Sequence, residues 1–148
     1  MIQSDYIKKI KKADIDEIIQ IENDSYKSPW IKEHFVKDIS NQYSINYMYK
    51  RDKELIGYLF GYLINDEYHL NKITVKEQHR YKKIGKLLFS YCLDKLINLD
   101  VKCIQLEVSS LNLIAQNFYK SLGFIKVGLR QNYYSIHEDA VLYNLEIK

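Results

Sequence analysis

The sequence contains little proline, glycine or cysteine. One proline and five glycines in 148 residues leave little room for flexible linkers. We therefore expect a single domain over residues 1–148, a length at which about 70% of the unfolded surface can be buried. The two cysteines, Cys92 and Cys103, match no metal-binding spacing, so we interpret them as reduced core thiols. The four histidines are scattered, and we predict no metal site.

Long apolar runs are also missing. No window approaches the roughly 18 apolar residues of a membrane-spanning helix, and the start, MIQSDYIKKIKKADIDEI, contains no apolar run of signal-peptide length. The net charge of +3 permits an acidic partner without requiring one. No basic–aromatic strand motif for nucleic acid stands out. We expect a cytoplasmic monomer that binds neither a membrane nor nucleic acid directly.

Apolar periodicity divides the chain into eleven elements in the order β, α, α, β, β, β, α, β, α, β, β. Helical spacing predicts helices over 13–26, 84–98 and 112–122, and a short helix capped by Ser28, with Pro29 in its first turn, that runs to Ile39. Gly123 is expected to end the last helix. Alternating patterns predict strands over 2–10, 44–51, 54–64, 67–75, 101–108, 124–130 and 138–147.

The strand–helix–strand unit from 67 to 108 predicts two parallel strands, whereas the other strands fit antiparallel hairpins. The predicted fold is α/β in the α+β sense: a mixed, mostly antiparallel sheet with one parallel pair and helices on both faces, in three layers. Ligands in such sheets favour the carboxyl ends of parallel strands. Those ends lie near Val75 and Val108.

The stretch EQHRYKKIGKLL follows Val75 and opens a helix. Backbone N–H groups in the first turn of a helix are unpaired and attract anions, and glycine lets a ligand approach closely. Arg80, Lys82, Lys83 and Lys86 add positive charge there. The stretch therefore fits a phosphate site, although an ordinary solvated basic helix start has the same pattern.

Further motifs carry a resemblance to a known superfamily. The stretch resembles the acetyl-CoA loop of the Gcn5-related N-acetyltransferases (GNAT): Arg or Gln, two residues, Gly, one residue, Gly or Ala. Arg80 and Gly85 match this pattern, whereas Lys83 stands where the first glycine is usual. LEVSSLNLIAQNFYKSLGF resembles the later strand and helix of the superfamily, with the expected spacing of Glu107, Asn112, Ala115, Tyr119, Gly123 and Phe124.

A narrower resemblance covers almost the whole chain. IENDSYKSPWIKEHF and LRQNYYSIHEDAVLYNL resemble the bacterial RimI-type ribosomal-protein-alanine N-acetyltransferases. In that group a Pro-Trp segment follows the first helix, and an Arg-x-x-Tyr-Tyr stretch precedes Glu-Asp-Ala. Both are present here, as Pro29–Trp30, Arg130–Tyr133–Tyr134 and Glu138–Asp139–Ala140.

The resemblance implies acetyl-CoA as cosubstrate. The main chain of Ile73, Thr74 and Val75 would pair with the pantetheine arm like an added strand. Asn112 would contact the coenzyme while capping its helix. The remaining coenzyme-binding candidates are the basic loop residues Arg80, Tyr81, Lys82, Lys83, Ile84, Gly85 and Lys86.

Two residues are predicted to be catalytic. Glu107 is the candidate base, acting directly or through water, because an apolar strand end would favour its neutral form. The alternative interpretation of Glu107 is a surface carboxylate without a catalytic role. Tyr119 is the candidate acid, since a phenol remains protonated at pH 7; its alternative is a core tyrosine. Of the adjacent aromatic residues, we expect Phe118 to face the core. Direct transfer is expected, without an acetyl-enzyme.

The acceptor amine is predicted from its ionisation. An α-amine with a pKa of about 8 is roughly 10% neutral at pH 7, against about 0.04% for lysine, so a single glutamate suffices for the α-amine. The resemblance implies the N-terminal alanine of a ribosomal small-subunit protein. Trp30, Tyr133, Tyr134 and Asp139 are the candidates for holding that peptide, or else belong to a packed core and a hairpin turn.

Two other functions stay open at this stage. An acetyltransferase of the same fold could act on a small amine or on internal lysines. A non-catalytic acetyl-CoA sensor would keep the coenzyme site alone; Lys83 favours it, and the presence of both Glu107 and Tyr119 opposes it.

Overall fold

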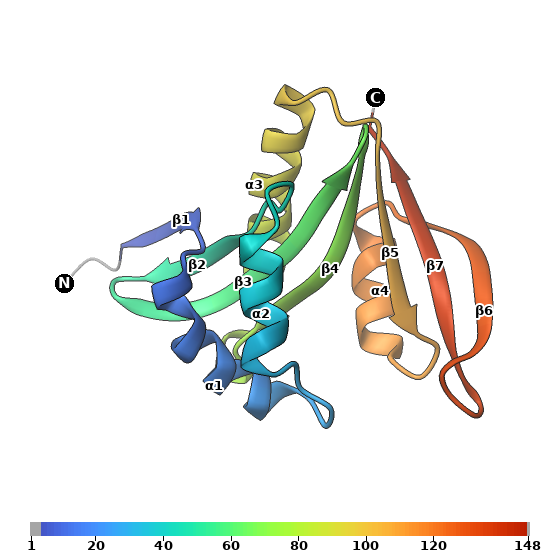
Figure 1. Cartoon of the computed structure of the whole chain (residues 1–148), viewed down its shortest axis with the longest axis horizontal. Helices are drawn as coiled ribbons and strands as arrows, with labels where there is room; N and C mark the ends of the chain where they lie inside the picture. Colours follow the sequence, from blue (N-terminus) through green and yellow to red (C-terminus); the bar gives the residue numbers. More distant parts are fainter. Residues whose placement is uncertain (1–3, 148) are drawn as a thin grey trace.

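A computed structural model of the chain describes residues 4–147 and contains one seven-stranded sheet with four helices and two short 3-10 turns (Figure 1). The strands lie in the order β1-β2-β3-β4-β5-β7-β6. They are β1 (Asp5–Lys9), β2 (Tyr47–Arg51), β3 (Glu54–Ile64), β4 (Glu67–Val75), β5 (Cys103–Ser109), β6 (Ile125–Ser135) and β7 (Glu138–Glu146).

The sheet is mixed as predicted. β4 and β5 are parallel, and every other neighbouring pair is antiparallel. The helices α1 (Ile15–Ser25) and α2 (Lys32–Ser40) pack on one face, and α3 (Ile84–Asn98) and α4 (Leu113–Ser121) pack on the other. The predicted three-layer fold and the order of its elements are confirmed.

Two apolar clusters hold these layers together. On the α1–α2 face, Ile15, Ile18 and Phe35 are fully buried against Tyr58 and Phe60 of β3. A larger cluster joins α3 and α4 to the opposite face. Each fully buried side chain of this size contributes about 1.5–3 kcal/mol relative to leaving it exposed, so α1 and α2 are firmly attached to β3.

β4 and β5 diverge along their length (Figure 1). They pair only at their beginnings, where Glu67, Tyr68 and His69 face Cys103, Ile104 and Gln105. β4 continues to Val75 paired with β3 alone, and β5 continues to Ser109 paired with β7. The carboxyl ends of the two strands are therefore separated, which leaves space at the edge where a ligand was predicted.

Two predicted boundaries differ most from the structure. The second helix begins at Lys32, not near Ser28, because Ile31 is its N-cap and the Trp30 N–H donates to the Glu22 carboxylate. The strand predicted over 124–130 continues to Ser135 through a register shift. Tyr133 and Tyr134 are therefore strand residues.

Other local predictions were correct. The third helix covers 84–98 as expected, and Gly123 follows α4 with a φ of +100°, the left-handed conformation that favours glycine. Of strand 2–10, residues 2 and 3 lie outside the described range, and the strand occupies Asp5–Lys9. None of the described helices combines the length and apolar character needed to span a membrane.

Candidate active site

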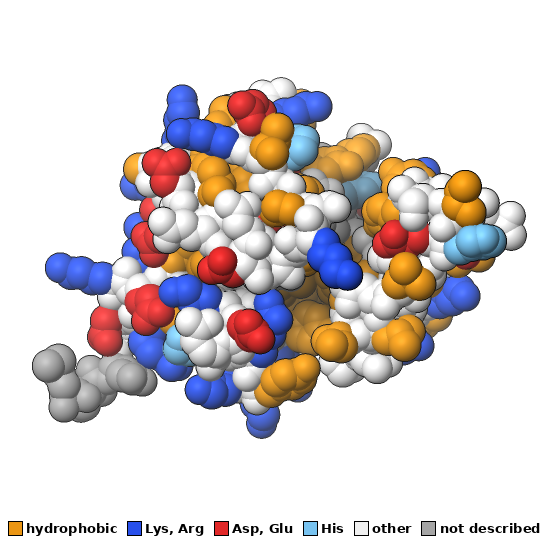
Figure 2. Space-filling model, turned by 90° about the horizontal axis from the view of Figure 1, so that it is seen from below, with side chains coloured by type: hydrophobic (Ala, Val, Ile, Leu, Met, Phe, Trp, Pro, Cys, Tyr) orange, Lys and Arg blue, Asp and Glu red, His pale blue; other side chains and the backbone are white. Residues whose placement is uncertain are grey.

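A cavity of about 570 Å³ opens beside the diverging strands. In the surface seen from that end, the molecule is hollowed between its N-terminal part on the left and the β5–β7–β6 part on the right (Figure 2). The cavity brings together residues from the α1–α2 connection and from β3 to β7. They are Trp30, Tyr62, His69, Leu70, Asn71, Gln105, Leu106, Glu107, Val127, Arg130, Tyr133, Tyr134, Leu142 and Tyr143.

Glu107 lies on β5 and lines this cavity. Its surroundings are not the apolar ones expected from the sequence, because its side chain is 32% exposed and Arg130 Nη2 lies 3.3 Å from Glu107 Oε1. The alternation of β5 causes this exposure: Leu106 and Val108 point into the core, so Glu107 points away from it. An accessible carboxylate in this position can accept a proton from a bound amine.

Tyr119 lies on α4 and is 8% exposed. Burial raises the pKa of its phenol above the ordinary value of 10, and the neighbouring phenols of Tyr26 and Tyr134 raise it further. Such a group remains protonated at neutral pH, as an acid requires.

The assignment of Phe118 as the core-facing residue of the pair was wrong. Tyr119 is the more deeply buried side chain, and Phe118 is only partly buried. The rings of the two residues lie 5.6 Å apart. Consecutive helix positions differ by about 100°, so both side chains can reach the sheet. Phe118 instead approaches Gly85, where a β-carbon would lie 3.2 Å from the Phe118 ring.

At two positions where the residue is not glycine, the basic loop has a backbone conformation that favours glycine. Lys83 has a φ of +65° and Tyr81 a φ of +62°, in the left-handed region that side chains disfavour. Lys83 is the N-cap of α3, no side chain caps the helix, and its first turn contains no acidic residue. The N–H groups of Ile84, Gly85 and Lys86 therefore remain available to an anion.

Arg80 ties this loop to the end of β4. Its Nε donates to the Val75 carbonyl at 2.9 Å, and its Nη2 donates to Ser25 Oγ at 3.3 Å. The guanidinium therefore fixes where the loop leaves the strand. Lys82 and Lys86 stay solvent-accessible, so their charges can contribute to binding a diphosphate.

The predicted pantetheine strand has an open edge. Ile73, Thr74 and Val75 pair with β3, and the pairing of β4 with β5 ends at His69. An extended ligand can therefore add to this edge. Thr74 is buried, and its hydroxyl lies 2.6 Å from that of Tyr26. Asn112 caps α4 as expected, accepting the Ala115 N–H at 3.1 Å.

Three of the four peptide-binding candidates meet at the cavity. Trp30, Tyr133 and Tyr134 line it, and the rings of Tyr133 and Tyr134 lie 5.2 Å apart, edge to face. Asp139 is not among the described residues that line it. Its carboxylate accepts the Asn132 N–H at 2.8 Å and so stabilises the β6–β7 hairpin.

Sequence reasoning missed Tyr26, Glu22 and Lys72, which lie behind the cavity wall. Glu22 had a recognisable signal, because it follows Ile15 and Ile18 on the apolar stripe of α1, where a charged residue needs a partner. Lys72 had no comparable signal within its strand. Arg130 was noted as part of a motif, but its contact with Glu107 depends on sheet pairing.

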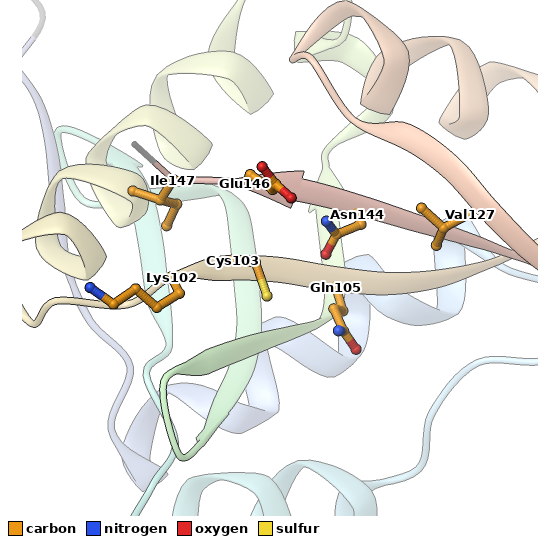
Figure 3. Close-up of a pocket in the computed structure, with 7 residues that line it drawn as sticks. All are labelled: Lys102, Cys103, Gln105, Val127, Asn144, Glu146 and Ile147. Atoms are coloured by element: carbon orange, nitrogen blue, oxygen red, sulfur yellow. The ribbon is translucent and has the colours of Figure 1, made fainter.

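A second hollow, of about 460 Å³, lies along the beginning of β5 and the end of β7 (Figure 3). It is lined by Lys102, Cys103, Gln105, Val127, Asn144, Glu146 and Ile147. It shares Gln105 and Val127 with the first cavity but includes no predicted site residue. Among residues 4–147 no three His, Cys, Asp or Glu side chains are grouped as metal ligands would be.

The sequence profile of the acetyltransferase (GNAT) family matches residues 15–124, which include α1, the basic loop, Glu107 and Tyr119. The chain belongs to this family. The GNAT fold is also found in solved structures. The crystal structure of the ribosomal-protein-S18-alanine N-acetyltransferase from Escherichia coli superimposes with a TM-score of 0.91 at 25% identity, covering 98% of this chain and 95% of that one.

Two further comparisons extend this result. A Bacillus subtilis protein named putative [ribosomal protein bS18]-alanine N-acetyltransferase is 30% identical, with 92% of this chain and 91% of that protein covered. Arabidopsis thaliana NAA60, solved in complex with acetyl-CoA, shares the fold at 18% identity and a TM-score of 0.85, covering 97% and 99%. This GNAT chain is thus an N-acetyltransferase similar to ribosomal-protein-alanine N-acetyltransferases.

Proposed function

We propose that this GNAT protein uses acetyl-CoA to acetylate the N-terminal α-amine of a ribosomal small-subunit protein that begins with alanine. The observation that carries the proposal is the cavity that Glu107 lines together with the aromatic side chains of Trp30, Tyr133 and Tyr134. Relatives named as ribosomal protein bS18-alanine N-acetyltransferases support the choice of substrate.

The coenzyme would bind on the side of the diverging strands opposite to the peptide cavity. The left-handed backbone at Tyr81 and Lys83, the uncapped start of α3 and the open edge of β4 fit a diphosphate followed by an extended arm. Asn112, the N-cap of α4, would contact that arm. When bound, acetyl-CoA would supply the activated acyl group.

Each catalytic side chain would move one proton. Glu107, directly or through a water molecule, would accept a proton from the peptide ammonium, so that the neutral amine can attack. Tyr119 would donate its phenolic proton to the departing thiolate, whose thiol has a pKa of about 8.5. Because the pKa of Tyr119 is raised, the phenol carries this proton at neutral pH.

The aromatic wall suits a small first residue. Tyr133 and Tyr134 are about half exposed and Trp30 is half-buried, so a methyl side chain can lie among rings while the ammonium faces Glu107. The α-amine has the lower pKa of the two protein amines, so one accessible carboxylate can deprotonate it near neutral pH. The proposal implies a cytoplasmic enzyme, acting as a monomer, whose partner is the ribosomal protein itself.

An acetylation assay with two peptides tests the proposal. One peptide begins Ala-Arg-Tyr-Phe with a free α-amine; the matched peptide is blocked at its N-terminus and contains an internal lysine. We expect acetyl-CoA-dependent transfer to the free α-amine only. Transfer to lysine, or to neither peptide while acetyl-CoA still binds, would contradict the proposed substrate.

A further inference from the structure

Glu22 is a fully buried carboxylate on the apolar face of α1. It accepts hydrogen bonds from the Trp30 N–H at 2.8 Å, from the Tyr58 hydroxyl at 2.6 Å and from the Lys72 ammonium. A buried charge is tolerated only when it is paired and hydrogen-bonded. Glu22 satisfies this condition with partners from three elements: the α1–α2 connection, β3 and β4.

Lys72 supplies the matching cation from β4, and its side chain is only 10% exposed. Its Nζ lies 4.1 Å from the ring centroid of Tyr26 and 4.6 Å from that of Trp30. An ammonium over an aromatic face is attracted by the ring, most strongly when water is excluded. Burial lowers the pKa of Lys72, and the Glu22 carboxylate opposes this shift.

A β-bulge explains why Lys72 reaches this side of the sheet. Gly61 pairs with Leu70 and Phe60 pairs with Lys72, so Asn71 is an extra residue in β4. Before the bulge Leu70 packs in the cluster of α3 and α4, whereas after it Lys72 lies beside Phe60 on the α1–α2 face. In a regular strand Lys72 would share the face of Leu70, two residues before it, because side chains alternate along a strand.

These contacts fix both ends of residues 26–31, which connect α1 to α2. At one end the Tyr26 hydroxyl lies 2.6 Å from Thr74 Oγ1. At the other end the Trp30 main chain is bonded to Glu22, and its ring lies over Lys72. Trp30 is also part of the cavity wall. The position of Trp30 in the cavity wall therefore depends on the Glu22–Lys72 pair, and the position of Lys72 depends on the bulge in β4.

We propose that Glu22 and Lys72 are positioning residues that hold segment 26–31 and thereby determine the affinity for the first residues of the acceptor peptide. This inference rests on the proposed function. Within residues 4–147 the Glu22 carboxylate and the Lys72 ammonium contact Trp30, Tyr26 and Tyr58, and neither charged group contacts the start of α3 on the coenzyme side. Its loss is therefore expected to affect peptide binding more than acetyl-CoA binding.

Steady-state kinetics with Lys72→Met test the inference, because methionine keeps most of the volume and removes the charge. We expect the KM for the peptide to rise about tenfold, since a displaced aromatic wall loses contact with the substrate. We expect the KM for acetyl-CoA to stay within about twofold. The control is Lys95→Met on α3, which also removes a lysine lying over an aromatic ring, that of Tyr91 at 5.1 Å, but far from segment 26–31.

A second variant controls for lost stability, because Lys72→Met leaves the Glu22 carboxylate buried without its cation. In Glu22→Gln/Lys72→Met neither charge remains. We expect the double variant to regain thermal stability without regaining the wild-type KM for the peptide. Recovery of both would assign the pair a purely structural role and overturn the inference.

Trp30 is the single tryptophan of the chain, so acrylamide quenching of its fluorescence reports on segment 26–31 without turnover. We expect stronger quenching in the Lys72 variants and no change in Lys95→Met. Unchanged quenching and an unchanged peptide KM in folded variants overturn the inference, even if the wild type acetylates the peptide. A wild type that transfers nothing to the peptide overturns the proposed function instead, and the quenching result then decides the positioning role alone.

Discussion

Arg130 Nη2 lies 3.3 Å from Glu107 Oε1, so the candidate base is paired with a cation. The guanidinium also lies 5.6 Å from the centre of the Tyr133 ring. Both members of the ion pair are partly exposed, and such pairs contribute only about 0–1 kcal/mol to stability. An incoming peptide ammonium can therefore replace Arg130 beside Glu107 at little cost.

Replacing Glu107 by glutamine should remove the proton acceptor while keeping the shape of the side chain. We expect kcat with the alanine peptide to fall about 100-fold or more, in the range of general-base catalysis, and the Kd for acetyl-CoA to remain unchanged. Steady-state rates and calorimetric titration measure the two quantities. Glu146→Gln, an exposed carboxylate near the end of β7, is the matched control. Full activity in Glu107→Gln would exclude this residue as the base.

Tyr119→Phe should lower kcat by a similar factor, because the ring stays and only the acidic proton is lost. The raised pKa of Tyr119 means that the phenol keeps its proton above pH 10, the ordinary tyrosine value. The ratio of the wild-type rate to the Tyr119→Phe rate should therefore stay constant between pH 7 and about 9.5. A ratio that decreases over this interval would show that the phenol ionises earlier and would contradict the assignment.

Lys83 carries a left-handed backbone without being glycine, so Lys83→Gly should stabilise the fold relative to Lys83→Ala by about 1 kcal/mol. Both variants lose the charge, and only the glycine loses the strain. Thermal unfolding measures the difference. Because the loop already has the glycine-like conformation, we expect Lys83→Gly to bind acetyl-CoA as well as the wild type does. Weaker binding in both variants would show instead that the ammonium contacts the coenzyme.

A methyl group at position 85 would lie 3.2 Å from the Phe118 ring, tighter than ordinary contact. Gly85→Ala should therefore push α3 from α4 and raise the KM for acetyl-CoA several-fold. Phe118→Leu should relieve this contact in the double variant, with a coupling energy of about 1 kcal/mol in a double-mutant cycle. Additive effects would place the cause elsewhere in the loop.

Local sequence patterns predicted most of the fold because they report on burial. Isoleucines at helical spacing predicted α1, and the apolar face of 84–98 predicted α3 to the residue. Sequence pattern failed where a tertiary contact fixed the boundary. Glu22 holds Trp30 in a non-helical connection and delays α2, and Asp139 holds Asn132 so that β6 continues past Arg130.

The sequence by itself determined the candidate groups for acetyl transfer, because a glutamate at a strand end, a tyrosine on the next helix and a basic helix start are local features. Only the tertiary structure decided which side chains surround these groups. The divergence of β4 from β5 opens the cavity at Glu107, and long-range sheet pairing places Arg130 beside it. The bulge at Asn71 turns Lys72 towards Glu22. These relationships join residues far apart in the chain, where periodicity carries no information about contact.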